Sequence, residues 1–179
     1  MIFTETALKG AWIIDPQRID DERGFFARSF CREEFAAHGL ETEVAQCNIS
    51  YNKAKGTLRG MHFQLLPRTE AKLVRCTRGA IYDVLIDLRP ASATFRQWTA
   101  VELTGNNHRS LYIPEGFAHG FQTLEDDSEV FYQMYEYFAP DCAAGVRWDD
   151  PAFGIAWPLA NPVISAKDRS YPDFIEPAP

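Results

Sequence analysis

The stretch KLVRCTRGAIYDVLIDLRP, residues 72–90, holds two runs of apolar and β-branched residues on either side of Arg78-Gly79. Such residues favour strands, and a glycine between two of these runs is typical of a hairpin. Later segments have the same character, with Gly, Pro, Asn or Asp between them: residues 98–105, 110–116, 120–126 and 129–140. About nine or ten strands with little helix predict an all-β sandwich, jelly roll or barrel.

The residues before this stretch extend the pattern. Residues 1–19 indicate two short strands, and a polar turn follows at residues 20–24. Residues 32–39, REEFAAHG, begin with acidic side chains and end with glycine, which predicts one short helix. Since no linker, low-complexity segment or internal repeat interrupts the chain, we expect a single domain over residues 1–179.

The composition limits the classes of function. A net charge of -7 argues against non-specific nucleic-acid binding, although a few cations in one cleft can still hold a small phosphorylated ligand. The opening MIFTETALKG lacks the features of a secretory signal, and no apolar run reaches the roughly 20 residues of a membrane span. The four cysteines form no CxxC pair and are expected to be reduced thiols. These features predict a cytoplasmic protein that binds neither nucleic acid nor membranes.

The densest polar cluster lies in GTLRGMHFQ, residues 56–64, within a segment otherwise suited to a buried strand. Because side chains alternate along a strand, His62 and Gln64 should point the same way. Arg59 should point the opposite way unless a bulge at a glycine turns it. A lone histidine here would usually be a core residue with its polar atoms satisfied, but its polar neighbours favour a site.

Each other candidate has an ordinary structural interpretation when taken alone. Lys72 could extend to solvent from its strand, and His119 could be a loop histidine within IPEGFAHGF. Tyr132 could pack in the core, as could the two tyrosines that follow it. The composition of SAKD, residues 165–168, indicates a surface loop. No metal site is expected, because the chain has no HxH pair and two separate histidines make a poor ligand set.

Nine motifs in order resemble those of the dTDP-4-dehydrorhamnose 3,5-epimerase family. They are DERGFF (21–26), QCNIS (46–50), LRGMHFQ (58–64), AKLVRC (71–76), DVLIDLRPASATF (83–95), IPEGFAHGF (113–121), WDDPAFGI (148–155), WP (157–158) and SAKD (165–168). The resemblance implies a double-stranded β-helix, that is, a cupin-like jelly roll with a few short peripheral helices.

The resemblance also implies an isomerase that converts dTDP-4-dehydro-6-deoxy-D-glucose to dTDP-4-dehydro-L-rhamnose. The C4 ketone acidifies the hydrogens on C3 and C5, so a base, an oxyanion stabiliser and an acid are sufficient and no cofactor is needed. His62 is the implied base, oriented by the Asp168 carboxylate. Lys72 is the implied stabiliser of the enolate oxygen, and Tyr132 is the implied acid on the opposite face. A phenol suits that role if nearby positive charge lowers its pKa.

A larger set of residues is implied to hold the nucleotide sugar. Arginine and lysine bind phosphate oxygens, glutamine, asparagine and histidine give polar contacts, and a phenylalanine stacks on the base. The set comprises Arg23, Arg28, Gln46, Asn48, Arg59, His119, Phe138 and Lys167. In the family, Arg23 comes from the partner subunit through an exchanged N-terminal segment, which implies a homodimer.

Four positions depart from the family pattern. Arg28 and Ala143 stand where the best-known members carry glutamate, and Cys47 stands where aspartate is frequent. Phe138 replaces a stacking tyrosine but keeps the ring face. The changes fit family drift. Because they fall at nucleotide contacts while the catalytic matches survive, they also raise the hypothesis of a GDP-, CDP- or UDP-linked sugar, or of a heptose.

Other functions fit parts of the same pattern. Relatives invert C3 and C5 or only one of them, with the same residues. A 3,4-ketoisomerase would move protons on one face of the sugar, and an opposite-face acid at Tyr132 argues against it. A binding module without catalysis would need only the phosphate clamp and the stacking ring. A metal-dependent cupin enzyme would lose its activity with chelators.

Overall fold

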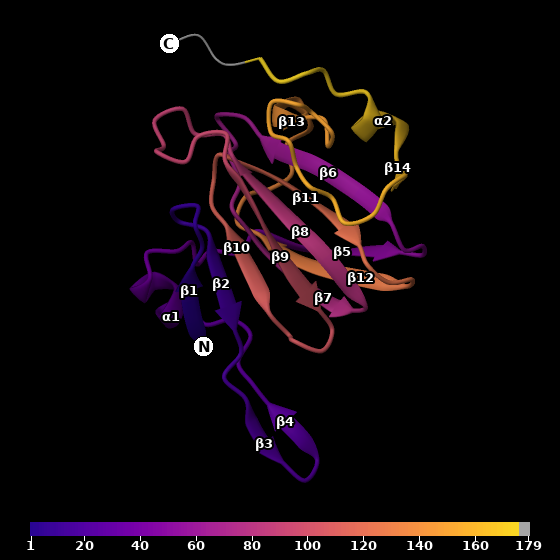
Figure 1. Cartoon of the computed structure of the whole chain (residues 1–179). Helices are drawn as coiled ribbons and strands as arrows, with labels where there is room; N and C mark the ends of the chain where they lie inside the picture. Colours follow the sequence, from indigo (N-terminus) through magenta and orange to yellow (C-terminus); the bar gives the residue numbers. More distant parts are fainter. Residues whose placement is uncertain (176–179) are drawn as a thin grey trace.

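Two β-sheets face each other in the structure, a computed structural model that describes residues 1–175 (Figure 1). The six-stranded sheet has the order β1-β2-β10-β7-β12-β5, and the second sheet has the order β13-β6-β11-β8-β9 with β14 beside β6. The helices α1, η1 and α2 are short and lie outside the sheets. The predicted all-β class with a few short helices is therefore confirmed.

The strands of each sheet come from distant parts of the chain. The six-stranded sheet comprises β1 (Ile2–Glu5), β2 (Trp12–Asp15), β5 (Gln46–Asn52), β7 (Lys72–Arg78), β10 (Ser110–Ile113) and β12 (Ser128–Met134). The second sheet comprises β6 (Thr57–Gln64), β8 (Ala80–Asp87), β9 (Trp98–Thr104), β11 (Phe117–Thr123), β13 (Ala143–Gly145) and β14 (Val163–Ile164). The remaining elements are β3 (Ile19–Asp21), β4 (Gly24–Phe26), α1 (Arg32–Ala37), η1 (Pro140–Cys142) and α2 (Ala166–Arg169).

The predicted hairpin at Arg78-Gly79 is wrong. Both runs form strands, but β7 pairs with β10 and β12, whereas β8 pairs with β9 and β11. Gly79 has a φ of +75°, and a Cβ there would lie 2.4 Å from Ser128 Oγ, so only glycine fits the turn. The chain crosses at this point from one sheet to the other, and both apolar runs contribute to the space between the sheets.

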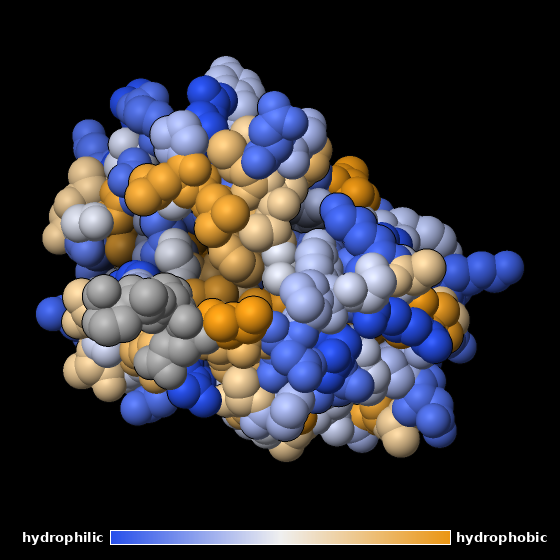
Figure 2. Space-filling model, turned by 90° about the horizontal axis from the view of Figure 1, so that it is seen from above, coloured by the Kyte–Doolittle hydropathy of each residue, from blue (hydrophilic) through white to orange (hydrophobic). Residues whose placement is uncertain are grey.

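Apolar side chains fill three layers. The inner core lies between the sheets and includes Val74 and Val130 from one sheet and Leu85 and Phe121 from the other. A second cluster packs α1, through Phe35, on the outer face of the six-stranded sheet. A third cluster packs the segment after β13 on the outer face of the other sheet. Figure 2 views the end that carries β13 and α2, where a band of hydrophobic surface runs beside mainly hydrophilic surface.

The hairpin of β3 and β4 extends away from the two sheets (Figure 1). Its residues are exposed, including Ile19, Phe25 and Phe26. We call residues 19–26 the arm. Phe25 lies against Arg18 and His108 of the same chain, whereas Ile19 and Phe26 remain exposed.

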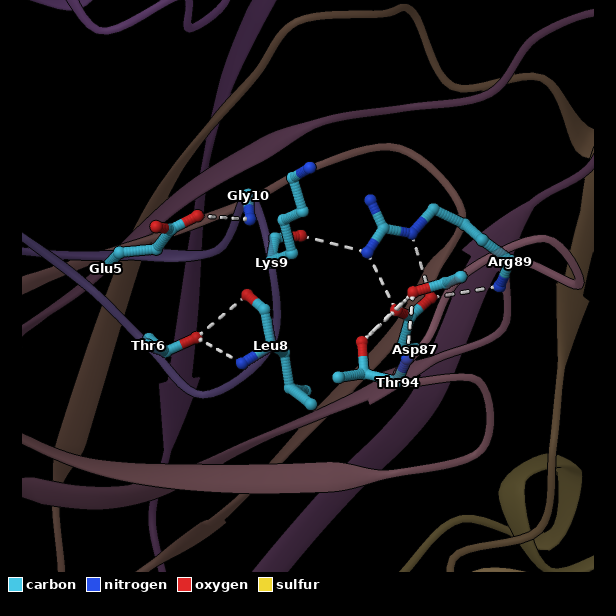
Figure 3. Close-up of polar contacts among 9 residues, drawn as sticks. Glu5, Thr6, Leu8, Lys9, Gly10, Asp87, Arg89 and Thr94 are labelled. Atoms are coloured by element: carbon cyan, nitrogen blue, oxygen red, sulfur yellow. Dashed lines mark hydrogen bonds and ion pairs between the residues drawn. The ribbon is translucent and has the colours of Figure 1, made fainter.

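A buried carboxylate braces the start of the chain against the end of β8 (Figure 3). Asp87 is completely buried and accepts hydrogen bonds from Arg89 Nε at 2.8 Å and from Thr94 Oγ1 at 2.7 Å. Arg89 also donates to the Lys9 carbonyl at 2.9 Å. Burial acts to raise the pKa of Asp87, but these hydrogen bonds outweigh it and lower the pKa to about 2. The brace therefore depends on a charged carboxylate.

Among the described residues, no helix is long and apolar enough to cross a membrane.

Candidate active site

A bulge in β6 decides which side chains reach the space between the sheets. His62 is paired with His119 of β11, but Arg59 is paired with Phe121, so β6 holds one extra residue in this interval. The extra residue falls at Gly60, whose φ is +133° and where a Cβ would lie 2.5 Å from Gly120 Cα. Arg59 and His62 consequently line the same cavity, as the sequence predicted for a glycine-associated bulge.

The His62 imidazole is hydrogen-bonded to a buried carboxylate. Its Nε2 lies 2.8 Å from Asp168 Oδ1, and the Gly60 N–H donates to Asp168 Oδ2 at 3.3 Å. Burial acts to raise the pKa of Asp168, but the hydrogen bond and charge of His62, the Gly60 N–H and the Ser165 side chain outweigh it, so the pKa lies below its usual value. A charged carboxylate can only accept, so Nε2 carries the proton and Nδ1 is the basic nitrogen.

The interpretation of SAKD as a surface loop is wrong. Ser165 caps the short helix α2, because its Oγ accepts a hydrogen bond from the Asp168 N–H at 3.0 Å. The residues around it are exposed, but Asp168 is 5% exposed and faces β6. Composition could not reveal this, because the burial arises from a contact across 106 positions of the chain.

Lys72 does not extend to solvent. It begins β7, its side chain is 9% exposed, and its Nζ lies 2.7 Å from Glu70 Oε1. The same ammonium donates to the His62 carbonyl at 3.5 Å. A charged group is thus fixed beside the His62 backbone, at the wall of a cavity that His62 also lines.

Tyr132 enters the cavity from the six-stranded sheet, whereas His62 enters from the other sheet. Burial raises the pKa of the Tyr132 phenol, the Arg59 guanidinium opposes that rise, and the Glu70 carboxylate adds to it. The condition that nearby positive charge lowers the pKa of the phenol is therefore not met, because burial dominates. The phenol is protonated at neutral pH, which is the form that can donate a proton.

A second histidine–carboxylate pair lies next to the first. His119 Nε2 is 2.7 Å from Asp83 Oδ1, and Asp83 is completely buried with its other carboxylate oxygen lacking a partner in the structure. The His119 side chain is 11% exposed and lines the cavity wall.

Two adjoining cavities share His62, Lys72 and Tyr132. The first, of about 490 Å³, is also lined by Arg59, His119 and Asp168. The second, of about 430 Å³, is lined by four more of the predicted substrate-binding residues: Gln46, Asn48, Phe138 and Lys167. Their combined size suits an extended ligand of several rings.

Two predicted substrate-binding residues lie outside these cavities. Arg23 lies at the tip of the arm and pairs with Asp21. Arg28 pairs with Glu34 at 2.8 Å on the outer side of the six-stranded sheet. Their own chain therefore does not bring either of them to the cavities that contain His62.

Sequence reasoning missed four residues that hold or border the site. Glu70 pairs with Lys72, Asp83 pairs with His119, and Asn52 accepts a hydrogen bond from Arg59 Nε at 2.7 Å. Tyr171 lies edge-on to His62, with ring centroids 6.2 Å apart. The signal for Glu70 is its place two residues before Lys72, and for Asp83 its charge within an apolar strand; the other two have no local signal.

In the part of the chain that the structure describes, no group of three or more His, Cys, Asp or Glu side chains is arranged to hold a metal ion. The arrangement instead offers proton chemistry. It combines a basic imidazole nitrogen, a buried ammonium and a protonated phenol around one space, and two of these groups come from opposing sheets.

Comparison with known proteins gives one consistent result. A sequence model of the dTDP-4-dehydrorhamnose 3,5-epimerase family matches residues 5–176. A curated enzyme of that name from Methanothermobacter thermautotrophicus is 45% identical over 94% of this chain and 92% of its own. A crystal structure from Bacillus anthracis with TDP and PPi bound has a TM-score of 0.93 and 41% identity, and covers 97% of this chain and 99% of that one.

A structure of the Legionella pneumophila enzyme in complex with dTDP-4-keto-L-rhamnose has a TM-score of 0.88 and 37% identity, and covers 95% of this chain and 90% of that one. These likenesses extend along nearly the whole chain and confirm the jelly-roll fold that the sequence motifs implied. The chain therefore belongs to the dTDP-4-dehydrorhamnose 3,5-epimerase family.

Proposed function

We propose that this isomerase inverts C3 and C5 of dTDP-4-dehydro-6-deoxy-D-glucose, with His62 as the base and Tyr132 as the acid. The observation that carries the proposal is the His62–Asp168 pair at 2.8 Å inside a cavity that Tyr132 enters from the opposing sheet. Epimerisation requires removal of a proton on one face of the sugar and its return on the other. Groups from two facing sheets suit that requirement.

The proton transfers balance without a redox partner. His62 Nδ1 takes a proton from the carbon next to the ketone, and the C–H electron pair moves to form the enolate. Lys72 stabilises the negative oxygen, since a cation already fixed in place loses little free energy to reorganisation. Tyr132 then gives its proton to the opposite face of the same carbon. The phenolate and the imidazolium return to their starting forms by exchange with solvent.

Asp168 acts on the reaction through His62. Its carboxylate holds Nε2 and so directs Nδ1 into the cavity, and it stabilises the imidazolium that forms. The Gly60 N–H and the Ser165 cap in turn hold the carboxylate. A mobile surface carboxylate could not give that orientation.

The nucleotide part of the substrate would occupy the rest of the two cavities. Arg59 donates its Nε to Asn52 and its Nη2 to the Tyr51 carbonyl at 3.5 Å, which leaves Nη1 and one N–H of Nη2 for phosphate oxygens. Phe138 is 61% exposed at the second cavity and offers a ring face to the base. Ala143 lines the same cavity, so the missing glutamate there leaves room close to the base.

A homodimer would complete the site. Arg23 and Arg28 belong to or follow the arm, which exposes Ile19 at 67% and Phe26 at 71%. The edge strand β5 exposes Ile49 and Tyr51 on its outer face. An arm placed over a partner would bury such surface and bring the arginines to the other chain's cavity. The four cysteines are free thiols, which supports action in the reducing cytoplasm.

NMR of nucleotide sugars in deuterated water tests the reaction and the substrate together. We expect deuterium at C3 and C5 of the thymidine compound and net inversion at both carbons. Tyr132→Phe should keep exchange at one carbon and lose net inversion. Binding without deuterium exchange would favour a binding module. Proton movement only between C3 and C4 would favour a ketoisomerase. Preference for a GDP, CDP or UDP compound would show that the substrate carries that nucleotide in place of dTDP.

Mixing two inactive variants tests the exchanged arm. If Arg23 serves the partner's site, heterodimers of Arg23→Ala and His62→Ala contain one site with both residues intact, and activity should return on mixing and refolding. If Arg23 acts within its own chain, neither site is intact and no activity returns. Light scattering of the wild-type protein gives the oligomeric state independently.

A further inference from the structure

We propose that Glu70 is a positioning residue of this site: its carboxylate fixes the Lys72 ammonium beside the reacting carbonyl oxygen. This inference rests on the proposed function, in which Lys72 stabilises the enolate. It adds a residue that pairs directly with Lys72 and lines the second cavity beside it.

The geometry of the pair is that of a directed contact. Glu70 Oε1 lies 2.7 Å from Lys72 Nζ, and the two side chains are 7% and 9% exposed. Lys72 Nζ also donates to the His62 carbonyl at 3.5 Å. An ammonium has three N–H groups, so these two acceptors leave one N–H for an oxygen of the substrate.

The loop that carries Glu70 is braced on both sides. The Gln64 side-chain amide donates to the Arg68 carbonyl at 2.8 Å, and the Thr69 hydroxyl donates to Glu115 at 2.8 Å. Arg68 pairs with Glu136 at 3.0 Å. These contacts fix the backbone just before Glu70, so its carboxylate has a defined position rather than a mobile one.

The ion pair between Glu70 and Lys72 is not explained by its contribution to fold stability. Removing two charges from water costs about as much free energy as their attraction returns, and an apolar pair of the same size is often as stable. This pair lies at a cavity wall with His62 and Tyr132, where orientation of the ammonium matters for chemistry. A flexible lysine without a partner would sample many rotamers, few of which place Nζ at the carbonyl oxygen.

Glu70 also affects the acid. Its negative charge contributes to the raised pKa of Tyr132, while Arg59 acts in the opposite direction. The other charged or titratable groups around this space are His62, Lys72, His119, Lys167 and Asp168. Removal of the Glu70 charge should therefore shift the alkaline limb of the pH–rate profile, which reports the phenol, to lower pH.

Steady-state kinetics and deuterium exchange of two variants test the inference. We expect Glu70→Ala to lower kcat by about 10- to 100-fold with KM within about threefold of wild type, because a misdirected ammonium affects the transition state more than binding. Glu70→Gln keeps an oxygen acceptor for Lys72, so it should recover most of kcat while its alkaline limb stays shifted.

Glu102→Ala is the control, because it removes an exposed carboxylate from β9, a strand that lines neither cavity. Circular dichroism and binding of dTDP establish that each variant is folded. A Glu70→Ala enzyme that has wild-type kcat and pH profile, with only a lower melting temperature, would show a structural role and overturn the inference. If the wild-type enzyme exchanges no deuterium, the proposed function itself fails, which is a separate result.

Discussion

Two histidine–aspartate pairs lie side by side in this protein. They differ in the solvent exposure of the imidazole rather than in the distance between nitrogen and carboxylate oxygen. His62 lies 2.8 Å from Asp168, and His119 lies 2.7 Å from Asp83. The two histidines are directly paired on β6 and β11. The His62 side chain, however, is 42% exposed, whereas that of His119 is 11% exposed.

The carboxylates differ as well. Asp168 receives additional support from the Gly60 N–H, whereas one oxygen of Asp83 is buried without a partner among the described residues. The accessible ring with the fully supported carboxylate is equipped to gain and lose a proton. The enclosed ring, held at 2.7 Å by a completely buried carboxylate, is equipped to stay in place. The contrast teaches that a short histidine–aspartate distance alone does not identify a base.

The largest effect should come from His62→Ala. We expect wash-in of solvent deuterium at C3 and C5 to fall by about 10⁴-fold, the upper range for loss of a general base. His119→Ala is the matched control, since it removes the neighbouring imidazole and should retain exchange once substrate is bound. Exchange at the wild-type rate in His62→Ala, measured by NMR, would refute the assignment of the base.

Asp168→Asn should have the next largest effect. The amide keeps the shape of the side chain, but it no longer stabilises the imidazolium, and we expect kcat to fall by about 10²-fold. Affinity for dTDP, measured by calorimetry, should change little. A large loss of affinity with normal kcat would instead mean that Asp168 organises the binding site.

His119→Ala should affect binding and stability more than chemistry. We expect KM to rise by about tenfold with kcat within a few-fold of wild type. The Asp83 carboxylate would lose its hydrogen-bond partner, so the free energy of unfolding should fall by about 1–3 kcal/mol. Urea unfolding measures this loss. Restored stability in the double variant with Asp83→Asn would confirm that the buried charge causes it.

A third buried aspartate, Asp87, gives the smallest effect on activity and the clearest effect of pH on stability. Its folded pKa of about 2 lies below the usual value of 3.8, so its contribution is fully present above about pH 4 and is lost as the pH falls toward 2. We expect Asp87→Asn to lower the free energy of unfolding by roughly 2 kcal/mol at pH 7, with unchanged deuterium exchange. The difference from wild type should shrink in acid; a constant difference would contradict the origin in charge.

The sequence predicted the parts of this comparison that depend on local pattern. Alternation along a strand identified the face of His62, and the glycine at position 60 allowed for the bulge that turns Arg59. The motifs named Asp168 only through resemblance, because nothing near position 168 indicates burial against a strand more than a hundred residues earlier. The hairpin at Gly79 failed because a glycine with positive φ serves a turn within one sheet and a crossing between two equally well.

The extra residue in β6 has a consequence for the substrates that the enzyme accepts. It places the Arg59 guanidinium, proposed to bind phosphate, and the His62 imidazole, proposed as the base, on one strand, so backbone geometry fixes the distance between them. The strand therefore sets the distance between the phosphate and the reacting carbon that a substrate must span. A keto-sugar joined to its nucleoside through a single phosphate would be too short to contact Arg59 and His62 together. We expect the enzyme to bind such a compound without catalysing its epimerisation.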